Sequence, residues 1–488
     1  MRRLGSGLRR RLAVVGACAS LLTACSPPPR APVRGPAVSK QSDKTDRESV
    51  AVTVYNQNFG VVKDTRRVKL ARGLVELSFK DVSANIQPET VQLHSVTPGA
   101  LFQVLEQNYR YDLLTPSKLL EKYVGKQVNV YRYNDKTGTD EKKTAEVLSV
   151  EDGVTLRIDG EITTNFAGRY GFAEVPSTLL QKPTLVWLLD SDRAEQRVEV
   201  TYLTQNLNWR ADYVLKLSAD DSEADLNGWV TLDNKSGTSY ENAALRLVAG
   251  DVNRLQPDAP VTISEVAYDS DVRAEKPQFH EEGLFEYHLY TLARPTTLLD
   301  KETKQVSLLA AEGVSVVKKL VFNGAPYFVP MRNGPLGTGM QVGVFVELQN
   351  SEKNHLGMPL PKGTVRLYKA DTSGSLQFIG EDAIDHTPRD EKLSLKLGYA
   401  FDVVADRVQK DWTQVDKCTT EAAYDIELRN HKDSDVQVEI NEPAIDEWEL
   451  LSQSQPSVKV DATTLRFDLK VPARGSSKVS YRIRVHHC

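Results

Sequence analysis

Residues 207–251, LNWRADYVLKLSADDSEADLNGWVTLDNKSGTSYENAALRLVAGD, contain strand-like runs separated by polar turns and show no helical period. In the first run, large or apolar side chains occupy every second position, namely Trp209, Ala211, Tyr213, Leu215 and Leu217. This period of two is typical of a half-buried strand. The runs GWVTLDN and AALRLVAG repeat it. The stretch therefore predicts the centre of an antiparallel sheet.

The composition of the whole chain is that of a globular protein. Its 488 residues are 40% hydrophobic and 26% charged, which leaves room for roughly three or four domains. The first 24 residues contain five arginines and no acidic residue, and the rest of the chain has 56 basic and 66 acidic residues, a net charge of −10. Contacts to nucleic-acid phosphates need the opposite sign, so no nucleic-acid partner is expected.

The N-terminus has the features of an export signal. The arginines precede LAVVGACASLL, an apolar run of 11 residues that is too short to span a bilayer. The run ends in Leu22-Thr23-Ala24-Cys25, which resembles the bacterial lipobox, where the cysteine thiol carries a diacylglycerol. The sequence thus predicts a lipoprotein signal peptide over residues 1–24 and lipidation of Cys25. A soluble secreted protein and an uncleaved anchor are the alternatives.

Lipidation of Cys25 predicts the location of the protein. Several acyl chains hold a protein on a membrane, whereas a single chain binds only marginally. Ser26 follows the cysteine in place of an aspartate, which resembles the pattern of lipoproteins sorted to the outer membrane of Gram-negative cells. Residues 25–48 are rich in Pro, Ser and charge and predict a disordered tether. We therefore expect an outer-membrane lipoprotein of the cell envelope that faces the periplasm or the cell surface.

Alternating runs continue to the C-terminus and predict an all-β fold of tandem antiparallel β-sandwich modules. An N-terminal β module is expected over residues 49–115, and a small inserted β-barrel-like domain over residues 116–182. A central β-sandwich region over residues 183–404, with a mobile loop at 253–282, precedes a C-terminal β-sandwich over residues 405–488. The candidates for helix are TPSKLLEKYVG from Thr115 and KETKQVSLLAA from Lys301.

Four strand-like segments end on an asparagine that is followed by a polar turn: Asn56, Asn234, Asn350 and Asn430. Asparagine tolerates left-handed backbone and hydrogen-bonds its own main chain. The unequal spacing excludes a solenoid and favours tandem modules with a similar first hairpin. The alternative is that such a turn is simply common in β proteins.

Cys418 and Cys488 are the cysteines that remain once the signal is removed and Cys25 is lipidated. Export places them in an oxidising compartment, where a disulfide is allowed. Cys418 precedes the strand EAAYDIELRN and Cys488 follows the strand KVSYRIRV. If these strands are antiparallel neighbours, the two cysteines come within disulfide distance. Two unpaired thiols are the alternative.

Four segments of the chain, WRADYVLKL, LNGWVTLDNKSGTSYENAALRLVAGDVNR, LFEYHLYTLARPTTLLDKETKQVSLL and LGMPLPKGTVRLYKAD, resemble one family. Its members are uncharacterised bacterial envelope proteins that carry a domain of unknown function, and they include the mucoidy inhibitor A-like proteins. The likeness extends from Ala51 to Val485. The mucoidy inhibitor A-like members have a long coiled coil where residues 119–162 here predict a small β insert. The resemblance implies an envelope location but no activity, catalytic residue or cofactor.

Two groups of side chains have the chemistry of a site. Glu286, His288 and Tyr290 share one face of the strand predicted over FEYHLYTL, so a carboxylate, an imidazole and a phenol could do acid-base work. A solvated or interface face is the alternative. Arg210 and Asp212 also share a strand face, where they could bind an anion or form a structural ion pair with neighbouring strands.

Other motifs favour neither a cofactor nor a metal. The run GPLGTGMQVG from Gly334 lacks the lysine of a phosphate loop and predicts a flexible hairpin. No CxxC, HExxH or GxSxG occurs, and the histidines, at 94, 280, 288, 355, 386, 431, 486 and 487, lack ligand spacing. We therefore expect a lipid-anchored envelope protein that acts as a binding or structural surface, with an envelope protein or a glycan as partner. The alternative is an envelope hydrolase with a cleft near Glu286 and His288.

Overall fold

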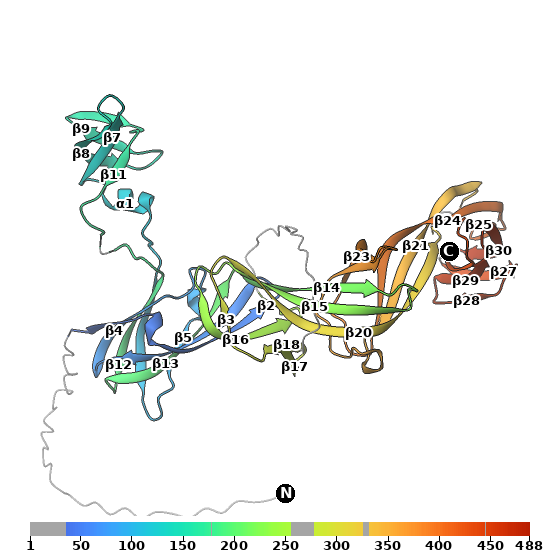
Figure 1. Cartoon of the computed structure of the whole chain (residues 1–488), viewed down its shortest axis with the longest axis horizontal. Coiled ribbons are helices and arrows are strands. Elements are labelled where there is room, and N and C mark those ends of the chain that lie inside the picture. The colour runs from blue at the N-terminus through green and yellow to red at the C-terminus, as the bar shows by residue number, and fades with distance from the viewer. Residues whose placement is uncertain (1–35, 177, 255–277, 326–330, 445) are drawn as a thin grey trace, which may run out of the picture.

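The computed structural model describes residues 36–176, 178–254, 278–325, 331–444 and 446–488. The predicted signal peptide and Cys25 lie outside these residues, as does most of the predicted loop at 253–282. Strands account for 65% and helices for 4% of the described residues, which confirms the all-β class. Figure 1 shows an elongated molecule in which the sheets follow one another from the N-terminal to the C-terminal end.

Two sheets pack together in the N-terminal half and share one hydrophobic core. The first has the strand order β1 (Val38–Ser42), β4 (Gly73–Lys80), β12 (Thr184–Ser191) and β6 (Phe102–Arg110). The second has the order β17 (Phe279–Leu284), β18 (Tyr287–Leu292), β16 (Tyr240–Ala249), β2 (Arg47–Tyr55), β3 (Phe59–Lys69), β13 (Glu195–Gln205) and β5 (Gln92–Ser95), and β19 (Thr296–Leu298) also pairs with β16. The short 3₁₀ helices η1 (Lys44–Asp46) and η2 (Pro88–Thr90) lie in the connections.

The N-terminal sheets combine strands from both sides of the predicted boundary at residue 183. β12 pairs with β4 and β6, and β13 pairs with β3 and β5. β16 pairs in parallel with β2, so the sheets are not purely antiparallel as predicted. Alternation along a strand shows which face is buried but not which strand lies beside it, or in which direction. The residues predicted as an N-terminal module are thus completed by strands from the predicted central region.

Ordered structure begins earlier than the predicted end of the tether at residue 48. β1 pairs in parallel with β4, with Val38 opposite Val75 and Ser42 opposite Phe79. The carbonyl oxygen of Ser42 accepts a hydrogen bond of 3.3 Å from the buried guanidinium of Arg66. The prediction of disorder is wrong for residues 38–48. The polar composition did not reveal that their backbone could add a strand to an existing sheet.

The predicted insert forms a separate unit that leaves and re-enters the chain between β6 and β12, which are paired neighbours. Figure 1 shows it standing away from the other sheets. The helix α1 (Pro116–Lys122) confirms the predicted helical turn, and Thr115 caps it by accepting from the backbone N–H of Lys118 at 3.2 Å. The sheet of this unit has the order β10 (Glu161–Thr164), β9 (Thr155–Ile158), β8 (Thr139–Ser149), β7 (Gln127–Asn134) and β11 (Arg169–Gly171).

The described strands of the insert form a sheet with two free edges, β10 and β11, so it does not close into the expected barrel. Its core is independent of the other clusters and includes Leu120 and Tyr123 from the helical segment and Val130 and Val147 from the sheet. The insert is therefore a small folded unit with its own hydrophobic core.

A long sheet connects the central and C-terminal parts of the molecule. Its strand order is β23 (Leu376–Ile384), β22 (Gly363–Ala370), β14 (Leu207–Leu217), β15 (Glu223–Asn234), β20 (Glu302–Asn323), β21 (Pro335–Gln349), β24 (Lys392–Gln414), β25 (Thr419–Asn430), β30 (Gly475–His486) and β27 (Glu447–Gln453). β26 (Val436–Pro443), β29 (Thr464–Val471) and β28 (Ser457–Lys459) extend it from β20. The 3₁₀ helix η4 (Glu352–Asn354) lies between β21 and β22.

Three strands of this sheet pass from one hydrophobic core into the next. β20 places Val316 in the central core and Phe322 in the C-terminal core, and β24 likewise contributes Leu395 and Val403. β21 places Val346 in the central core and Val342 in the C-terminal core. The predicted module boundary at residue 405 therefore lies inside a continuous strand. Period-two alternation is identical on both sides of such a crossing, so it could not mark the change of core.

The stretch 207–251 has the predicted period, but its strands divide between two sheets. In β14 the side chains of Trp209, Ala211, Tyr213, Leu215 and Leu217 are all buried. β14 and β15 form an antiparallel hairpin in the long sheet, whereas β16 joins the N-terminal sheet. The indole of Trp209 crosses between them and donates to the carbonyl of Val248 at 3.2 Å. The stretch thus connects the two halves of the central core.

Two further predictions are corrected by the observed strands. Residues 279–282 of the predicted loop belong to β17, which pairs antiparallel with β18. The candidate helix KETKQVSLLAA lies almost wholly within β20. Over so short a segment, its mixture of polar and apolar residues fits the helical period of 3.6 and the strand period of two equally well. The segment is a strand because β20 pairs with β15.

Asn234, Asn350 and Asn430 are buried and make the same set of hydrogen bonds. Each side-chain oxygen accepts from a backbone N–H, and each side-chain amide donates to a nearby loop carbonyl and to two carbonyls of a more distant connection. The amide acceptors are Thr238, Leu298 and Leu299; Met358, Thr387 and Pro388; and Ser434, Val471 and Pro472. None of the three asparagines has a positive φ, so main-chain bonding, and not left-handed backbone, explains their use. Asn56 differs, with its amide 3.4 Å from His386 Nε2.

We predict that Asn430→Ala lowers the free energy of unfolding by about 3 kcal/mol, because buried carbonyls left without a donor cost roughly 1–3 kcal/mol each. Chemical denaturation monitored by circular dichroism measures the change. The control is Asn323→Ala, since Asn323 is exposed at the end of β20 and accepts one bond from Asn441. Its expected effect is within about 0.5 kcal/mol. Equal effects for the two variants would show that the buried amide has no special role.

Candidate functional site

The structure does not bring Glu286, His288 and Tyr290 together. Glu286 is exposed in the turn between β17 and β18 instead of lying on a strand. His288 Nδ1 lies 2.7 Å from Glu281 Oε1 across the hairpin. Tyr290 is buried, which raises the pKa of its phenol, and it donates to the carbonyl of Pro359 at 2.9 Å. Glu286 is therefore separated from His288 and Tyr290, which both lie on β18.

Arg210 and Asp212 belong to a polar network that crosses the outer face of the long sheet. Arg210 Nη1 lies 3.0 Å from Asp233 Oδ2 on β15, and Asp212 Oδ1 accepts from Arg366 on β22 at 3.1 Å. Thr231 donates its hydroxyl to Asp212 Oδ2 at 2.8 Å. These contacts link neighbouring strands and pair the charged groups with one another. Arg210 and Asp212 therefore form the structural ion pairs that the sequence offered as an alternative, and not an anion site.

The glycine-rich run from Gly334 forms most of the first half of β21 instead of a flexible hairpin. Its pairing with β24 is interrupted by shifts of register after Pro335, Gly337 and Gln341. A further shift follows Val344, which lies opposite Gly398. Glycine supplies the backbone freedom that successive β-bulges require. The run therefore bends a strand where β21 leaves one core and enters the next.

A pocket of about 260 Å³ lies beside these bulges, between β20, β21, β23 and β24. Its apolar walls are Leu217, Val344, Val346, Ile379 and Leu397. Gly398 has φ 140° and Val344 lies opposite it, so the β21–β24 pairing is irregular at the wall of the pocket. The side chains of the central and C-terminal cores do not fill this space. The pocket is thus a consequence of the change of core within continuous strands.

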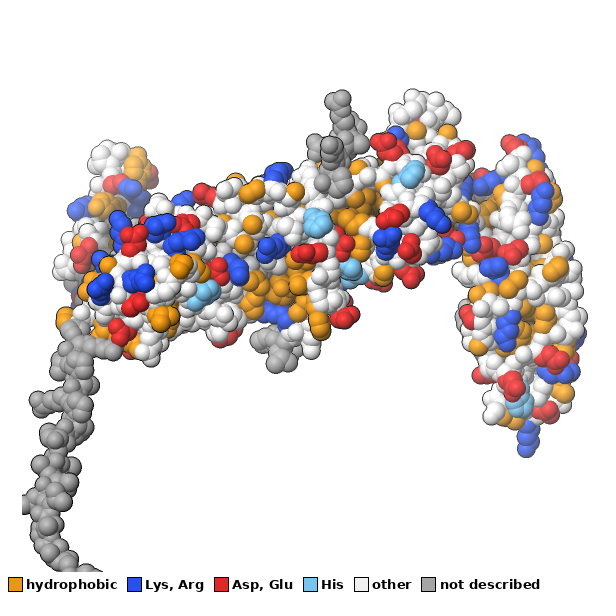
Figure 2. All heavy atoms as spheres, turned by 90° about the horizontal axis from the view of Figure 1, so that it is seen from below, with side chains coloured by type: hydrophobic (Ala, Val, Ile, Leu, Met, Phe, Trp, Pro, Cys, Tyr) orange, Lys and Arg blue, Asp and Glu red, His pale blue; other side chains and the backbone are white. Residues whose placement is uncertain are grey.

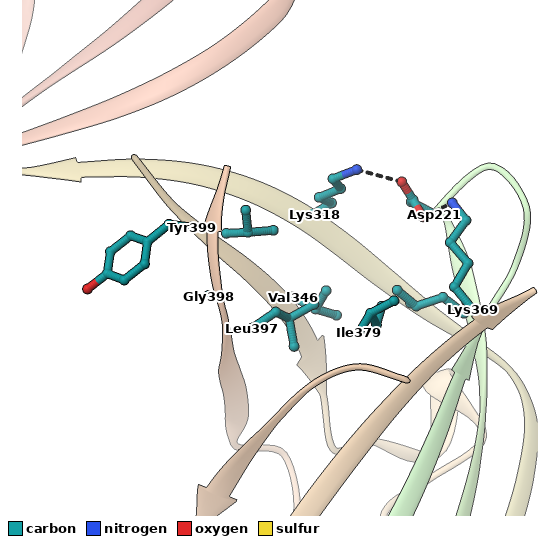
Figure 3. Close-up of a pocket in the computed structure, with 10 residues that line it drawn as sticks. Asp221, Lys318, Val346, Lys369, Ile379, Leu397, Gly398 and Tyr399 are labelled. Atoms are coloured by element: carbon teal, nitrogen blue, oxygen red, sulfur yellow. Dashed lines mark hydrogen bonds and ion pairs between the residues drawn. The ribbon is translucent and has the colours of Figure 1, made fainter. Parts of the chain in front are cut away.

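One end of the pocket carries charge. Lys318 Nζ lies 2.7 Å from Asp221 Oδ2, and Lys369 Nζ pairs with the other oxygen of the same carboxylate (Figure 3). Burial opposes ionisation of Asp221, but the hydrogen bonds and charges of the two lysines outweigh it and lower the pKa of this carboxyl. Two cations therefore share one anion at this end. In Figure 3 Val346, Ile379 and Leu397 lie between this cluster and Tyr399.

Exposed aromatic side chains lie on β23 and β24, two of the strands around the pocket. Phe401 on β24 is 95% exposed, Tyr399 is 53% exposed, and Phe378 on β23 is 54% exposed. The three residues are called the aromatic rim below. Figure 2 shows that basic and acidic side chains are otherwise intermixed over the visible face. Tyr399 lines the pocket, and Phe378 and Phe401 are near lining residues in the sequence, next to Ile379 and two residues after Tyr399. Large exposed apolar side chains gathered in this way are typical of a surface that meets another molecule.

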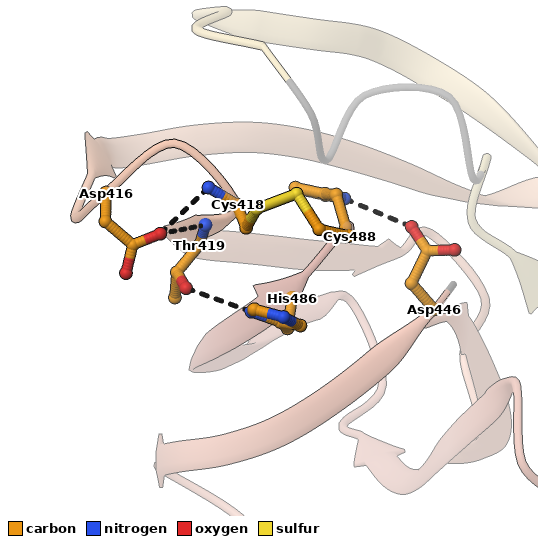
Figure 4. The surroundings of a disulfide bond; sticks show 7 residues. Asp416, Cys418, Thr419, Asp446, His486 and Cys488 are labelled. Carbon is orange, nitrogen blue, oxygen red and sulfur yellow. Dashed lines mark hydrogen bonds and ion pairs between the residues drawn. A yellow bond between two sulfur atoms is a disulfide. The ribbon is translucent and has the colours of Figure 1, made fainter.

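Cys418 and Cys488 are joined in a disulfide, with 5.2 Å between their Cα atoms (Figure 4). β25 and β30 are antiparallel neighbours, and Thr419 pairs with His486. The backbone N–H of His487 donates to the carbonyl of Cys418 at 2.7 Å. The bond therefore holds the C-terminus against the start of β25, as the sequence-based geometry required.

The described residues contain no group of three or more His, Cys, Asp or Glu side chains that could hold a metal ion. His486 and His487 contact Thr419 and Thr420, respectively, and His487 also lies 3.1 Å from Asp446. Over the same described ranges, no helix has the length and apolar character needed to cross a membrane.

A family model described as a domain of unknown function (DUF4139) matches residues 198–488. The chain belongs to the DUF4139 family. No curated protein matches the chain. The DUF4139 region starts within β13 and contains the pocket, the aromatic rim, the three buried asparagines and the disulfide.

Sequence reasoning did not find the pocket of the DUF4139 region. Asp221 lies in the turn between β14 and β15, Lys318 on β20 and Lys369 on β22, so the charged end is assembled from residues far apart in the chain. The available signal was the pair of aromatic residues in GYAF at residues 398–401, where Tyr399 and Phe401 are two positions apart on β24. Residues two positions apart on a strand share one face, but this spacing does not show whether that face is exposed.

We predict that Cys488→Ser destabilises the DUF4139 region by about 4 kcal/mol, since the bond closes a loop with a sequence separation of 70 residues. Denaturant titration without reductant measures the loss. The double variant Cys418→Ser/Cys488→Ser is the control and should lose a similar amount, because both remove the same bond. Two reactive thiols in denatured, unreduced wild-type protein would contradict the pairing.

Proposed function

We propose that the chain is a lipid-anchored cell-envelope protein whose DUF4139 region acts as a binding surface. The observation that carries this proposal is the aromatic rim of Phe378, Tyr399 and Phe401 beside an apolar pocket. Aromatic side chains contribute much of the binding energy at protein interfaces, because they bury a large area with few rotatable bonds. The partner is an envelope protein or a glycan.

The anchor in this proposal is a lipid on Cys25, which would place the protein on the outer membrane. The basic segment, the apolar run and the Leu-Thr-Ala-Cys sequence support it. Residues between Cys25 and β1 would separate the sheets from the lipid surface. A relation to the mucoidy inhibitor A-like proteins, proposed from the sequence resemblance, agrees with such a location.

The first test of the proposal is the anchor. Cys25→Ser should leave an unlipidated precursor or a soluble species, because the acyl chains have no thiol to attach to. Mass spectrometry of the N-terminal peptide and fractionation of membranes measure this result. Cys18→Ser is the matched control, since Cys18 lies within the predicted signal, and it should leave the anchor unchanged. An unmodified Cys25 inside the wild-type mature chain would disprove lipidation.

The second test is the aromatic rim. A photo-crosslinking phenylalanine analogue at Phe401 should give a discrete, light-dependent product in intact cells, because this side chain is the most exposed of the aromatic rim and lies two residues after Tyr399, which lines the pocket. The same analogue at Phe285, which is 90% exposed in the β17–β18 turn, is the control and should give little product. Protease digestion and glycan-hydrolase digestion of the product distinguish the two classes of partner. Equal yields at both positions, or no product at Phe401, would contradict the proposal.

A further inference from the structure

We propose that the pocket between β20, β21, β23 and β24 binds the single hydrocarbon chain of an anionic amphiphile. The chain lies among Leu217, Val346 and Leu397, and the carboxylate or phosphate head group meets Lys318 and Lys369. This inference goes beyond the proposed function, because the amphiphile binds in the pocket and the macromolecular partner meets the aromatic rim.

The aliphatic walls of the pocket favour a hydrocarbon chain as the ligand. Val346 and Leu217 are buried, and Val344, Ile379 and Leu397 are half-buried around the opening, so the wall is aliphatic on several sides. Moving each methylene group from water into such surroundings strengthens binding by about fourfold. Drug-sized ligands occupy pockets of roughly 300–1,000 Å³. The volume of about 260 Å³ lies just below this range, so the pocket has room for no more than one hydrocarbon chain.

The charged end of the pocket favours an anionic head group. Asp221 provides one carboxylate for two ammonium groups, so the lining residues carry an excess of positive charge at this end. Lys318 and Lys369 are each partly exposed, with side-chain exposures of 40% and 29%. A lysine ammonium is a flexible point charge, so it can turn from Asp221 to a bound head group without moving the strands. A cationic amphiphile would meet like charge in the same place.

One residue of the aromatic rim is part of the pocket lining. Tyr399 lines the pocket and extends away from the charged end in Figure 3. Lys396 Nζ lies 4.7 Å from the centre of the Tyr399 ring. A chain longer than the pocket would therefore continue along an aromatic surface. The ligand and the partner of the proposed function would then meet at neighbouring positions.

Binding is tested on the full protein purified from membranes and exchanged to remove lipid. The probe is 11-(dansylamino)undecanoic acid, whose fluorescence rises in an apolar site, and decanoate, decyl phosphate and decanol compete with it below their micellar concentrations. We expect saturable binding and displacement by decanoate and decyl phosphate, with decanol weaker by about tenfold because it lacks the charge. The two anions distinguish a carboxylate from a phosphate ligand.

Ile379→Trp fills the pocket from β23 and should weaken all competitors by about tenfold or more. Leu376→Trp is its control, since Leu376 lies on the same strand, is exposed and does not line the pocket. Val344→Phe replaces Ile379→Trp if that variant fails to fold. Lys318→Gln/Lys369→Gln should weaken the two anions by about tenfold and decanol by less than about twofold.

Absence of saturable binding, or binding that the pocket-filling variants leave unchanged, would overturn the inference. Binding that the two lysine replacements leave unchanged would overturn the assignment of an anionic head group. A crosslinked product at Phe401 together with failure of amphiphile binding would contradict this inference alone. Loss of the crosslink with retained amphiphile binding would contradict the macromolecular partner instead.

Discussion

Buried asparagine amides determine where strands end in the DUF4139 region. A carbonyl at the end of a strand has no ladder partner and is costly to bury. Asn234, Asn350 and Asn430 each supply amide donors to such carbonyls from two different connections. The same bonds join a strand to the loop that follows it and to a connection much further along the chain. Successive parts of the sheet are thus closed in the same way.

Continuity of the strands explains the shape of the molecule. β20 and β24 have 22 and 23 residues and contribute to two cores, so no linker separates the central and C-terminal parts. A strand that changes core must also change the side chains it packs against. The bulges between β21 and β24 allow this change, and the space left beside them is the pocket. The long strands and the pocket therefore have one cause.

Polar groups within the sheet are arranged differently from the polar groups at the pocket. The charged groups around Asp212 bond one another across neighbouring strands, and His288 is paired with Glu281. At the pocket, two lysines share one carboxylate beside aliphatic walls and exposed aromatic side chains. Groups that are satisfied within the sheet stabilise it, whereas an excess of one charge next to apolar surface is available to a ligand. This contrast is the basis for placing the binding surface at β23 and β24.

The sequence by itself determined the all-β class, the buried face of β14, the start of α1 and the recurrence of Asn234, Asn350 and Asn430, because each depends on residues close together in the chain. It also identified Cys418 and Cys488 as flanking the two strands whose pairing would join them. Only the tertiary structure decided which strands are neighbours, where the cores change, that residues 38–48 are ordered, and that Glu286 lies in a turn instead of on the strand with His288 and Tyr290. The pocket could not be predicted from the sequence either. A period of two specifies the face that a side chain occupies, but partners from distant strands decide whether that face is filled, bonded or open.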